Sequence, residues 1–135
     1  MSTSLAARGV PVYPVTGVDL SAALGKLIQF TAGVPAVSAS ATIPANGIVL
    51  EAAVAAKVSS VGLFGGNLPP VRGLLSGATA AVKFGDRLMQ AADGTFTKDV
   101  GPGTARVVVA EVGELNGGVA GDLIEIVPLS PMILP

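Results

Sequence analysis

Residues 77–128 decide the fold, because short β-branched runs alternate there with Gly-Asp and Asp-Gly corners. The stretch reads GDRL at 85–88, DGTF at 93–96, ARVVVAE at 105–111 and GDLIEIV at 121–127. Glycine supplies the positive φ angles that tight turns need, and aspartate bonds to its own backbone at such corners. This alternation predicts short antiparallel strands joined by tight turns.

An upstream stretch repeats this pattern sixty positions earlier. The matches are 15–17 with 75–77, 24–25 with 84–85, 48–51 with 108–111, Leu63 with Leu123 and, after a one-residue slip near Lys26, Gln29 with Gln90. We interpret them as two copies of one β unit, at residues 10–64 and 70–124, separated by the Gly- and Pro-rich run 65–70. Chance matching in a chain rich in Ala, Val and Gly is the alternative.

The expected fold class is all-β: a small β-barrel or β-sandwich of short antiparallel strands with extended terminal arms. A β domain at 10–128 holds the strands, which we expect at 26–30, 34–38, 48–54, 59–64, 71–75, 87–91, 95–98, 105–112 and 123–128. Residues 10–15 alternate proline with apolar residues, which predicts an edge strand or an extended strap. Residues 19–25 and 79–85 suit at most one helical turn each, with Asp19 as the N-cap of the first.

Composition excludes several function classes. The chain of 135 residues has no Cys and no His, so it lacks thiolate metal ligands and the commonest general base. Eight basic and nine acidic residues give a net charge of −1, which offers no electrostatic footprint for nucleic acid. Half of the residues are hydrophobic and only 13% are charged, so we expect other subunits to cover much of the surface.

No motif selects a catalytic or cofactor site. Most carboxylates lie beside glycine, where a turn explains them, and no Ser-x-x-Lys or phosphate-binding loop pattern occurs. We therefore expect no enzyme activity, no cofactor and no bound metal. No apolar run reaches the roughly 18 residues of a membrane span, and residues 1–8 lack the pattern of a secretion signal.

The two ends of the chain are predicted to be arms. The N-terminal arm, residues 1–9, is polar apart from Leu5, which we expect to anchor it. The C-terminal apolar arm, residues 129–135, holds Leu129, Met132, Ile133 and Leu134, and its prolines argue against a ladder in the chain's own sheet. Each large apolar side chain left in water costs roughly 1.5–3 kcal/mol. The C-terminal arm should therefore fold back over the β domain or lie across a neighbouring subunit.

Charged residues supply further interface candidates. Arg72, Arg87 and Arg106 are candidate interface cations, because arginine is enriched at protein interfaces, although a solvated face explains them equally well. Glu51 and Glu111 take matching places in the two copies. They either bond a neighbouring chain or blunt a strand edge, and we favour the second reading.

The order of motifs in the C-terminal half resembles the small capsid cement, or decoration, proteins of tailed bacteriophages. The residues that carry this resemblance lie at 76–77, 85–88, 92–95, 106–111 and 121–126. The chain departs from the family pattern at Val109, where a small residue is common, and in the long loop 113–121.

The resemblance implies a compact β domain on the outer surface of the virion, made in the host cytoplasm. It would clamp neighbouring subunits of the major capsid protein, often as a homotrimer. The alternative is a receptor- or carbohydrate-binding module on the head surface. Such sites usually expose Trp or Tyr beside polar groups, and this chain has only Tyr13.

Overall fold

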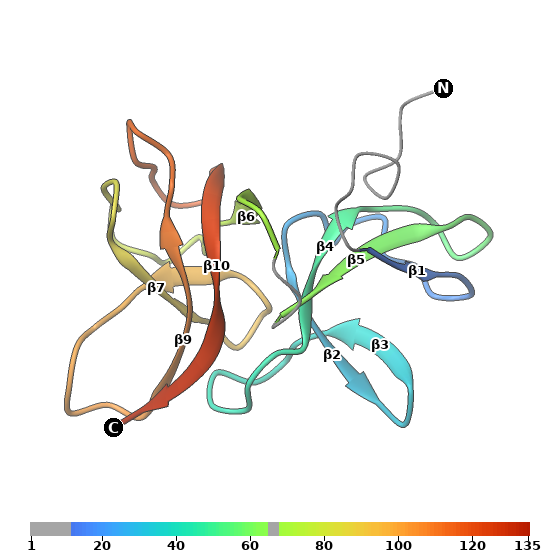
Figure 1. Ribbon diagram of the computed structural model, residues 1–135, viewed down its shortest axis with the longest axis horizontal. Coiled ribbons are helices and arrows are strands. Elements are labelled where there is room, and N and C mark those ends of the chain that lie inside the picture. The colour runs from blue at the N-terminus through green and yellow to red at the C-terminus, as the bar shows by residue number, and fades with distance from the viewer. Residues whose placement is uncertain (1–11, 65–67) are drawn as a thin grey trace.

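The computed structural model describes residues 12–64 and 68–135, which form two curled, five-stranded antiparallel sheets without any helix (Figure 1). We call residues 12–64 the first half and residues 68–135 the second half. Each sheet curls into a half-barrel. The all-β class and the two similar halves expected from the sequence are thus confirmed.

The two halves share one strand topology. The first half contains β1 (Tyr13–Val15), β2 (Leu27–Thr31), β3 (Val34–Val37), β4 (Gly47–Glu51) and β5 (Ser59–Leu63). The second half contains β6 (Val71–Leu74), β7 (Arg87–Gln90), β8 (Phe96–Lys98), β9 (Arg106–Val112) and β10 (Leu123–Leu134). The sheet orders are β1-β5-β4-β2-β3 and β6-β10-β9-β7-β8, so β1 to β5 correspond in sequence to β6 to β10.

Turn residues explain how the short strands are joined. Ala32 and Gly33, with φ angles of 51° and 80°, close the β2–β3 hairpin in the two-residue turn whose twist suits antiparallel strands. β1 lies at a sheet edge, as expected. An edge strand tolerates Pro14, which has no N–H to donate to a neighbouring strand. The helical turn expected after Asp19 is absent: its carboxylate accepts the Ser21 N–H at 3.0 Å, as an N-cap would, but residues 21–22 and 24–25 form only turns.

Backbone hydrogen bonds show which residues of the two halves correspond. The Gly25 N–H donates to the Val49 carbonyl, as the Gly85 N–H donates to the Val112 carbonyl. Val49 therefore corresponds to Val112 and not to Val109, so the offset of sixty holds for β2 and β7 but not for the other strands. Connecting turns of different length shift the numbering, whereas the ladders keep their pattern.

Further expected matches fail. Tyr13 pairs with Val61 as Val71 pairs with Ile126, so Val15 corresponds to Gly73 and not to Leu75. Leu27 pairs with Ile48 as Arg87 pairs with Glu111, so Glu51 and Glu111 do not occupy matching places. Val61 pairs with Val49 as Ile126 pairs with Val112, which excludes the match of Leu63 with Leu123. Phe30 pairs with Pro35 as Gln90 pairs with Phe96, so Gln90 corresponds to Phe30 and not to Gln29.

Two hydrophobic clusters form the core, and they explain why adjacent residues of β2 and β4 are both buried. The smaller cluster contains Val15, Leu20, Ala23, Ile28, Val49 and Val61, all from the first half. The larger one contains buried residues of the second half together with Leu27, Ala45 and Ile48. Because neighbouring side chains of a strand point to opposite faces, one face of the first sheet packs on its own half and the other on the second half.

Candidate functional site

A buried glutamine joins the two halves. Gln90 of β7 is only 2% exposed. Its Oε1 accepts the Ala45 N–H at 3.0 Å, and its Nε2 donates to the carbonyls of Ser40 and Ile43 at 2.8 and 2.6 Å. A buried amide whose polar atoms are all bonded specifies one arrangement of the partners. Sequence reasoning missed this role, although a glutamine following Leu88 and Met89 in an apolar strand was a signal for it.

The two sheets differ in chemistry at corresponding positions. Leu27 and Ile48 are cross-strand partners with no exposed surface, packed in the core shared with the second half. Arg87 and Glu111 are the corresponding partners in the second half, where Arg87 is exposed and Glu111 is half-buried. The face that is apolar in the first half is therefore charged in the second.

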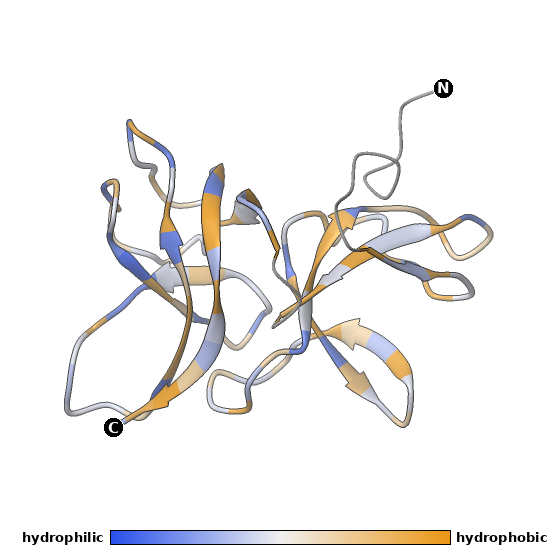
Figure 2. Ribbon diagram, viewed as in Figure 1, coloured by the Kyte–Doolittle hydropathy of each residue, from blue (hydrophilic) through white to orange (hydrophobic). Residues whose placement is uncertain are grey.

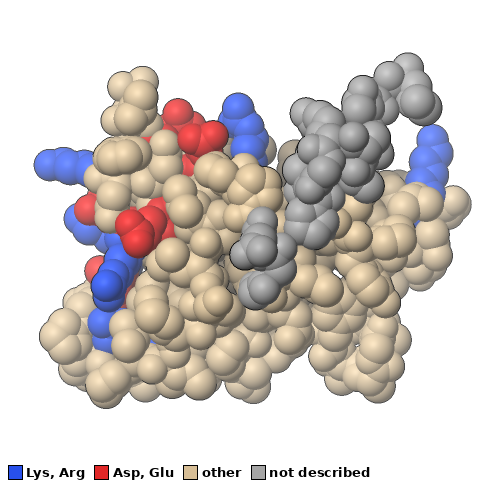
Figure 3. All heavy atoms as spheres, in the orientation of Figure 1, with Lys and Arg blue, Asp and Glu red and all other residues tan. Residues whose placement is uncertain are grey.

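Charged side chains concentrate on the second half, as Figure 3 shows for one side of the molecule. The charged residues of the first half are Asp19, Lys26, Glu51 and Lys57. Those of the second half are Arg72, Lys83, Asp86, Arg87, Asp93, Lys98, Asp99, Arg106, Glu111, Glu114, Asp122 and Glu125. Because both halves share one topology, this difference belongs to their surfaces and not to the fold.

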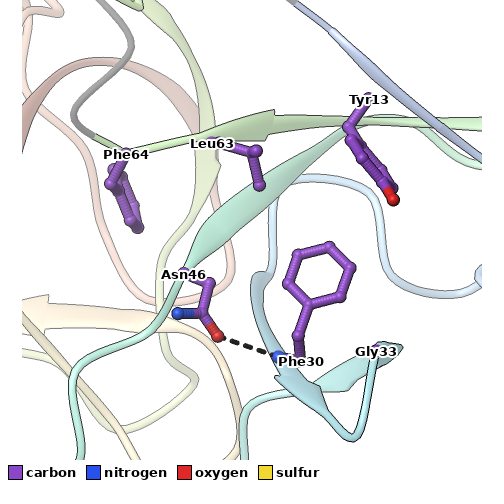
Figure 4. A pocket seen from close by; sticks show the side chains of 6 residues that line it. All are labelled: Tyr13, Phe30, Gly33, Asn46, Leu63 and Phe64. Atoms are coloured by element: carbon purple, nitrogen blue, oxygen red, sulfur yellow. Dashed lines mark hydrogen bonds between the residues drawn. The ribbon is translucent and has the colours of Figure 1, made fainter.

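A hollow whose described lining carries no charge opens on the first half (Figure 4). Its volume is about 450 Å³, and it is lined by Tyr13, Phe30, Gly33, Asn46, Leu63 and Phe64. The rings of Tyr13 and Phe30 meet edge-on, with centroids 5.7 Å apart and planes at 77°. The Oδ1 atom of Asn46 accepts the Phe30 N–H at 2.8 Å, which holds the amide in place. Tyr13 is 49% exposed, so this aromatic surface is open to a partner.

The expected C-terminal arm is in fact part of a strand. Met132, Ile133 and Leu134 of β10 pair with Val108, Val107 and Arg106 of β9, which corrects the expectation that residues 129–135 form no ladder. The register shifts between Pro128 and Met132, so the second proline, Pro131, lies within a bulge.

The first proline of β10 fits for a different reason. The Glu125 carbonyl accepts the Gly113 N–H from the end of β9, so strand alternation turns the Pro128 nitrogen away from β9. β6 pairs with β10 only as far as Ile126. The missing donor of Pro128 therefore costs no ladder bond, because it faces the side where β6 has ended.

Arg106 bonds to the chain at the C-terminal end of β10. The side chain is only 8% exposed, forms an ion pair with Asp99 and donates from Nη1 to the Pro135 carbonyl at 2.8 Å. Burial raises the pKa of Asp99, but bonds from Arg106 and the Gly101 N–H, with the Arg106 charge, outweigh it and lower the pKa below its usual value. Arg106 is thus bonded within its own chain, in contrast to the exposed interface cation expected.

The other interface candidates lie apart. Arg72 and Arg87 are exposed, and Arg72 donates to the Leu123 carbonyl at 3.3 Å. Ile133 and Met132 are 68% and 37% exposed, whereas Leu129 and Leu134 are half-buried. Figure 2 shows hydrophobic colour at the C-terminal end of β10, where Leu129, Met132, Ile133 and Leu134 lie on both sides of the strand; we call these four residues the β10 face. Leu5 lies outside the described residues.

Other titratable groups are explained by local turns. A side-chain hydrogen bond from Ser21 lowers the pKa of Asp19, and one from Thr95 lowers the pKa of Asp93. Within residues 12–64 and 68–135, no three His, Cys, Asp or Glu side chains gather as metal ligands. The same residues include no helix long and apolar enough to cross a membrane.

Comparison of the chain with protein-family models, with curated proteins and with solved structures finds no match. Its function is therefore argued from the β10 face, the hollow and the distribution of charge.

Proposed function

We propose that this protein is a structural component of a phage virion, which binds the outside of the assembled head and stabilises contacts between major capsid subunits. The observation that carries the proposal is the β10 face, where Ile133 and Met132, on opposite sides of the strand, both stay exposed although the strand is bonded to β9. Side chains already held on a ladder lose little conformational freedom when they dock, so more of their burial energy is available for binding.

Such a role needs only a modest binding free energy from each copy of the protein. Burying a large apolar side chain contributes roughly 1.5–3 kcal/mol before the costs of association. Many copies on a symmetric shell multiply this modest term. A protein that binds only the assembled shell stabilises it by linkage, without any chemical step.

We further propose that the protein associates with itself as a homotrimer on the outer virion surface, after synthesis in the host cytoplasm. Self-association is supported by the low charged fraction, 13%, together with large apolar side chains left exposed on both halves. The number three and the location follow only from the resemblance to capsid cement proteins.

Cosedimentation with expanded heads assembled without this protein tests the proposal. The wild-type protein should pellet with the heads, and Ile133→Asp should lower its affinity at least about tenfold, or 1.4 kcal/mol. Leu115→Asp is the matched control, because Leu115 is 79% exposed and lies in a turn outside the strands. Wild-type protein that stays in the supernatant contradicts a head-binding role. Normal binding by Ile133→Asp would show that the β10 face takes no part in head binding.

A receptor- or carbohydrate-binding module is the second candidate, and the exposed Tyr13 beside Asn46 in the hollow is the observation that favours it. A sugar, however, needs several polar partners for its hydroxyl groups. The described lining offers the apolar side chains of Phe30, Leu63 and Phe64, the single hydroxyl of Tyr13 and one amide, whose oxygen already accepts the Phe30 N–H. This lining suits an apolar protein side chain better than a sugar.

A further inference from the structure

The second half shows how a site corresponding to the hollow is filled. Tyr13 pairs with Val61 as Val71 pairs with Ile126, so Tyr13 corresponds to Val71, just as Phe30 corresponds to Gln90. Gln90 bonds three residues of the first half, and Val71 packs beside the shared core. In the second half, therefore, the β3–β4 loop and the apolar side chains of Leu27 and Ile48 occupy this position, whereas in the first half it is open as the hollow.

The chemistry of the filled position indicates what fits the open one. The first half contributes Leu27, Ala45 and Ile48 to the shared core, and none of them carries charge. The described lining of the hollow is equally free of charge and offers the rings of Tyr13 and Phe30 as contact surface. Aromatic side chains in pockets are frequent anchors of protein interfaces.

The equivalent face of another copy does not suit the hollow. Where the first half has Leu27 and Ile48, the second half presents Arg87 and Glu111. Burying this pair against the uncharged, aromatic side chains that are described in the hollow would remove both charges from water, at a cost of several kcal/mol per ion. A charged end face also stops repeated units from stacking without limit, as the polar end repeats of solenoid proteins do.

We propose that the hollow is a docking site for an uncharged apolar segment of a capsid-shell subunit, and that Tyr13 and Phe30 are its anchors. This inference rests on the proposed head-binding function, because the shell supplies the partner. The protein would then contact the shell at two places, the β10 face on the second half and the hollow on the first.

Binding of Tyr13→Asp to undecorated heads tests the inference. Tyr13 lies half exposed at a sheet edge, so the substitution should leave the urea unfolding midpoint close to that of the wild type. Its affinity for heads should fall at least about tenfold. Val34→Asp is the matched control, because Val34 lies in β3 of the same half, is 56% exposed and does not line the hollow.

Each contrary outcome has a distinct meaning. Unchanged binding by Tyr13→Asp, with binding lost in Ile133→Asp, would refute the hollow as a docking site and leave head binding intact. Wild-type protein that does not bind heads would refute both proposals. A Tyr13→Asp protein with a smaller sedimenting size than the wild type would mean that a second copy occupies the hollow, against the proposal.

A sugar in the hollow would also refute the proposal. Tyr13 is the single Tyr of a chain without Trp, so fluorescence excited at the red edge of tyrosine absorption reports on the hollow. A neutral glycan that changes this fluorescence would identify a carbohydrate site. Phe30→Ala provides a second variant for the head assay, because it removes the other anchor ring without adding charge.

Discussion

The side chain of Gln90 accepts a hydrogen bond from the Ala45 N–H at 3.0 Å across the join between the two halves. The same amide donates to two carbonyls of the loop between β3 and β4, those of Ser40 and Ile43. The relative position of the halves thus depends on these three side-chain bonds and on apolar packing. It also depends on two backbone bonds, from the Leu27 N–H to the Gly94 carbonyl and from the Leu74 N–H to the Gly25 carbonyl.

Gln90→Met should destabilise the protein because it keeps the side-chain size but leaves these three backbone groups unbonded. Each buried group without a partner costs about 1–3 kcal/mol, so we expect the free energy of unfolding to fall by at least about 2 kcal/mol. Urea denaturation measures this fall. Gln29→Met is the control, because Gln29 is half-buried on β2 and makes no side-chain hydrogen bond to the described residues. Equal effects of both substitutions would contradict the role of Gln90.

Gly94→Ala should be more costly than Gly85→Ala, although both glycines have positive φ angles, of 83° and 85°. That conformation costs an L-residue about 1–2 kcal/mol at either position. A Cβ atom at Gly94 would also lie 2.5 Å from Cγ1 of Val37 in the first half, whereas one at Gly85 meets nothing within 4 Å. Chemical denaturation of both variants isolates the contact between the halves. Identical losses would mean that the join relaxes around the added methyl group.

Low pH should weaken the ion pair between Asp99 and Arg106. Folding lowers the pKa of Asp99, so its stabilising contribution is complete above the unfolded value of about 4 and is lost as pH falls through the folded value. Asp99→Asn should therefore destabilise most near pH 7, where it leaves the buried Arg106 charge unpaired.

Unfolding free energies of the wild type and Asp99→Asn between pH 7 and 2.5 measure the effect. The difference between them should shrink below about pH 4. Glu125→Gln is the control, because Glu125 is an exposed carboxylate on β10, the strand that leads to Pro135. A difference that does not vary with pH would contradict the ion pair.

Arg87→Leu combined with Glu111→Ile should make the protein assemble head to tail. These two changes give the second half the apolar pair that Leu27 and Ile48 form in the first. A new apolar face that fits a site elsewhere on the molecule generates open-ended assemblies. Light scattering should detect species larger than the wild-type oligomer.

Two further variants check this mechanism. Arg72→Leu combined with Glu125→Ile is the control, because Arg72 and Glu125 are also opposite-charge cross-strand partners and both are exposed. Adding Tyr13→Asp should reverse the assembly by placing a charge in the hollow. Equal assembly of both double variants would show that general hydrophobicity, and not the hollow, drives it.

The sequence by itself determined the local structure. Alternating β-branched runs and Gly-Asp corners placed most strands within a few residues of their observed bounds, because strand and turn preferences act over short distances. The strands expected at 26–30 and 34–38, for example, are the two arms of the hairpin that Ala32 and Gly33 close. The duplication was also visible, although one offset of sixty with a slip near Lys26 misplaced residues that it matched in β1, β2, β4 and β5.

Only the tertiary structure decided which surfaces these strands present. The prolines of residues 129–135 argued against a strand, but that rule depends on whether a neighbouring strand needs the missing donor. The apolar pattern of β2 likewise did not reveal that Leu27 meets the second half while the corresponding Arg87 faces solvent. Tyr13, Phe30 and Leu63 lie far apart in the chain and line one hollow because β1, β5, β4 and β2 are neighbours in one sheet. Contacts of this kind depend on how whole sheets pack, which no local sequence pattern encodes.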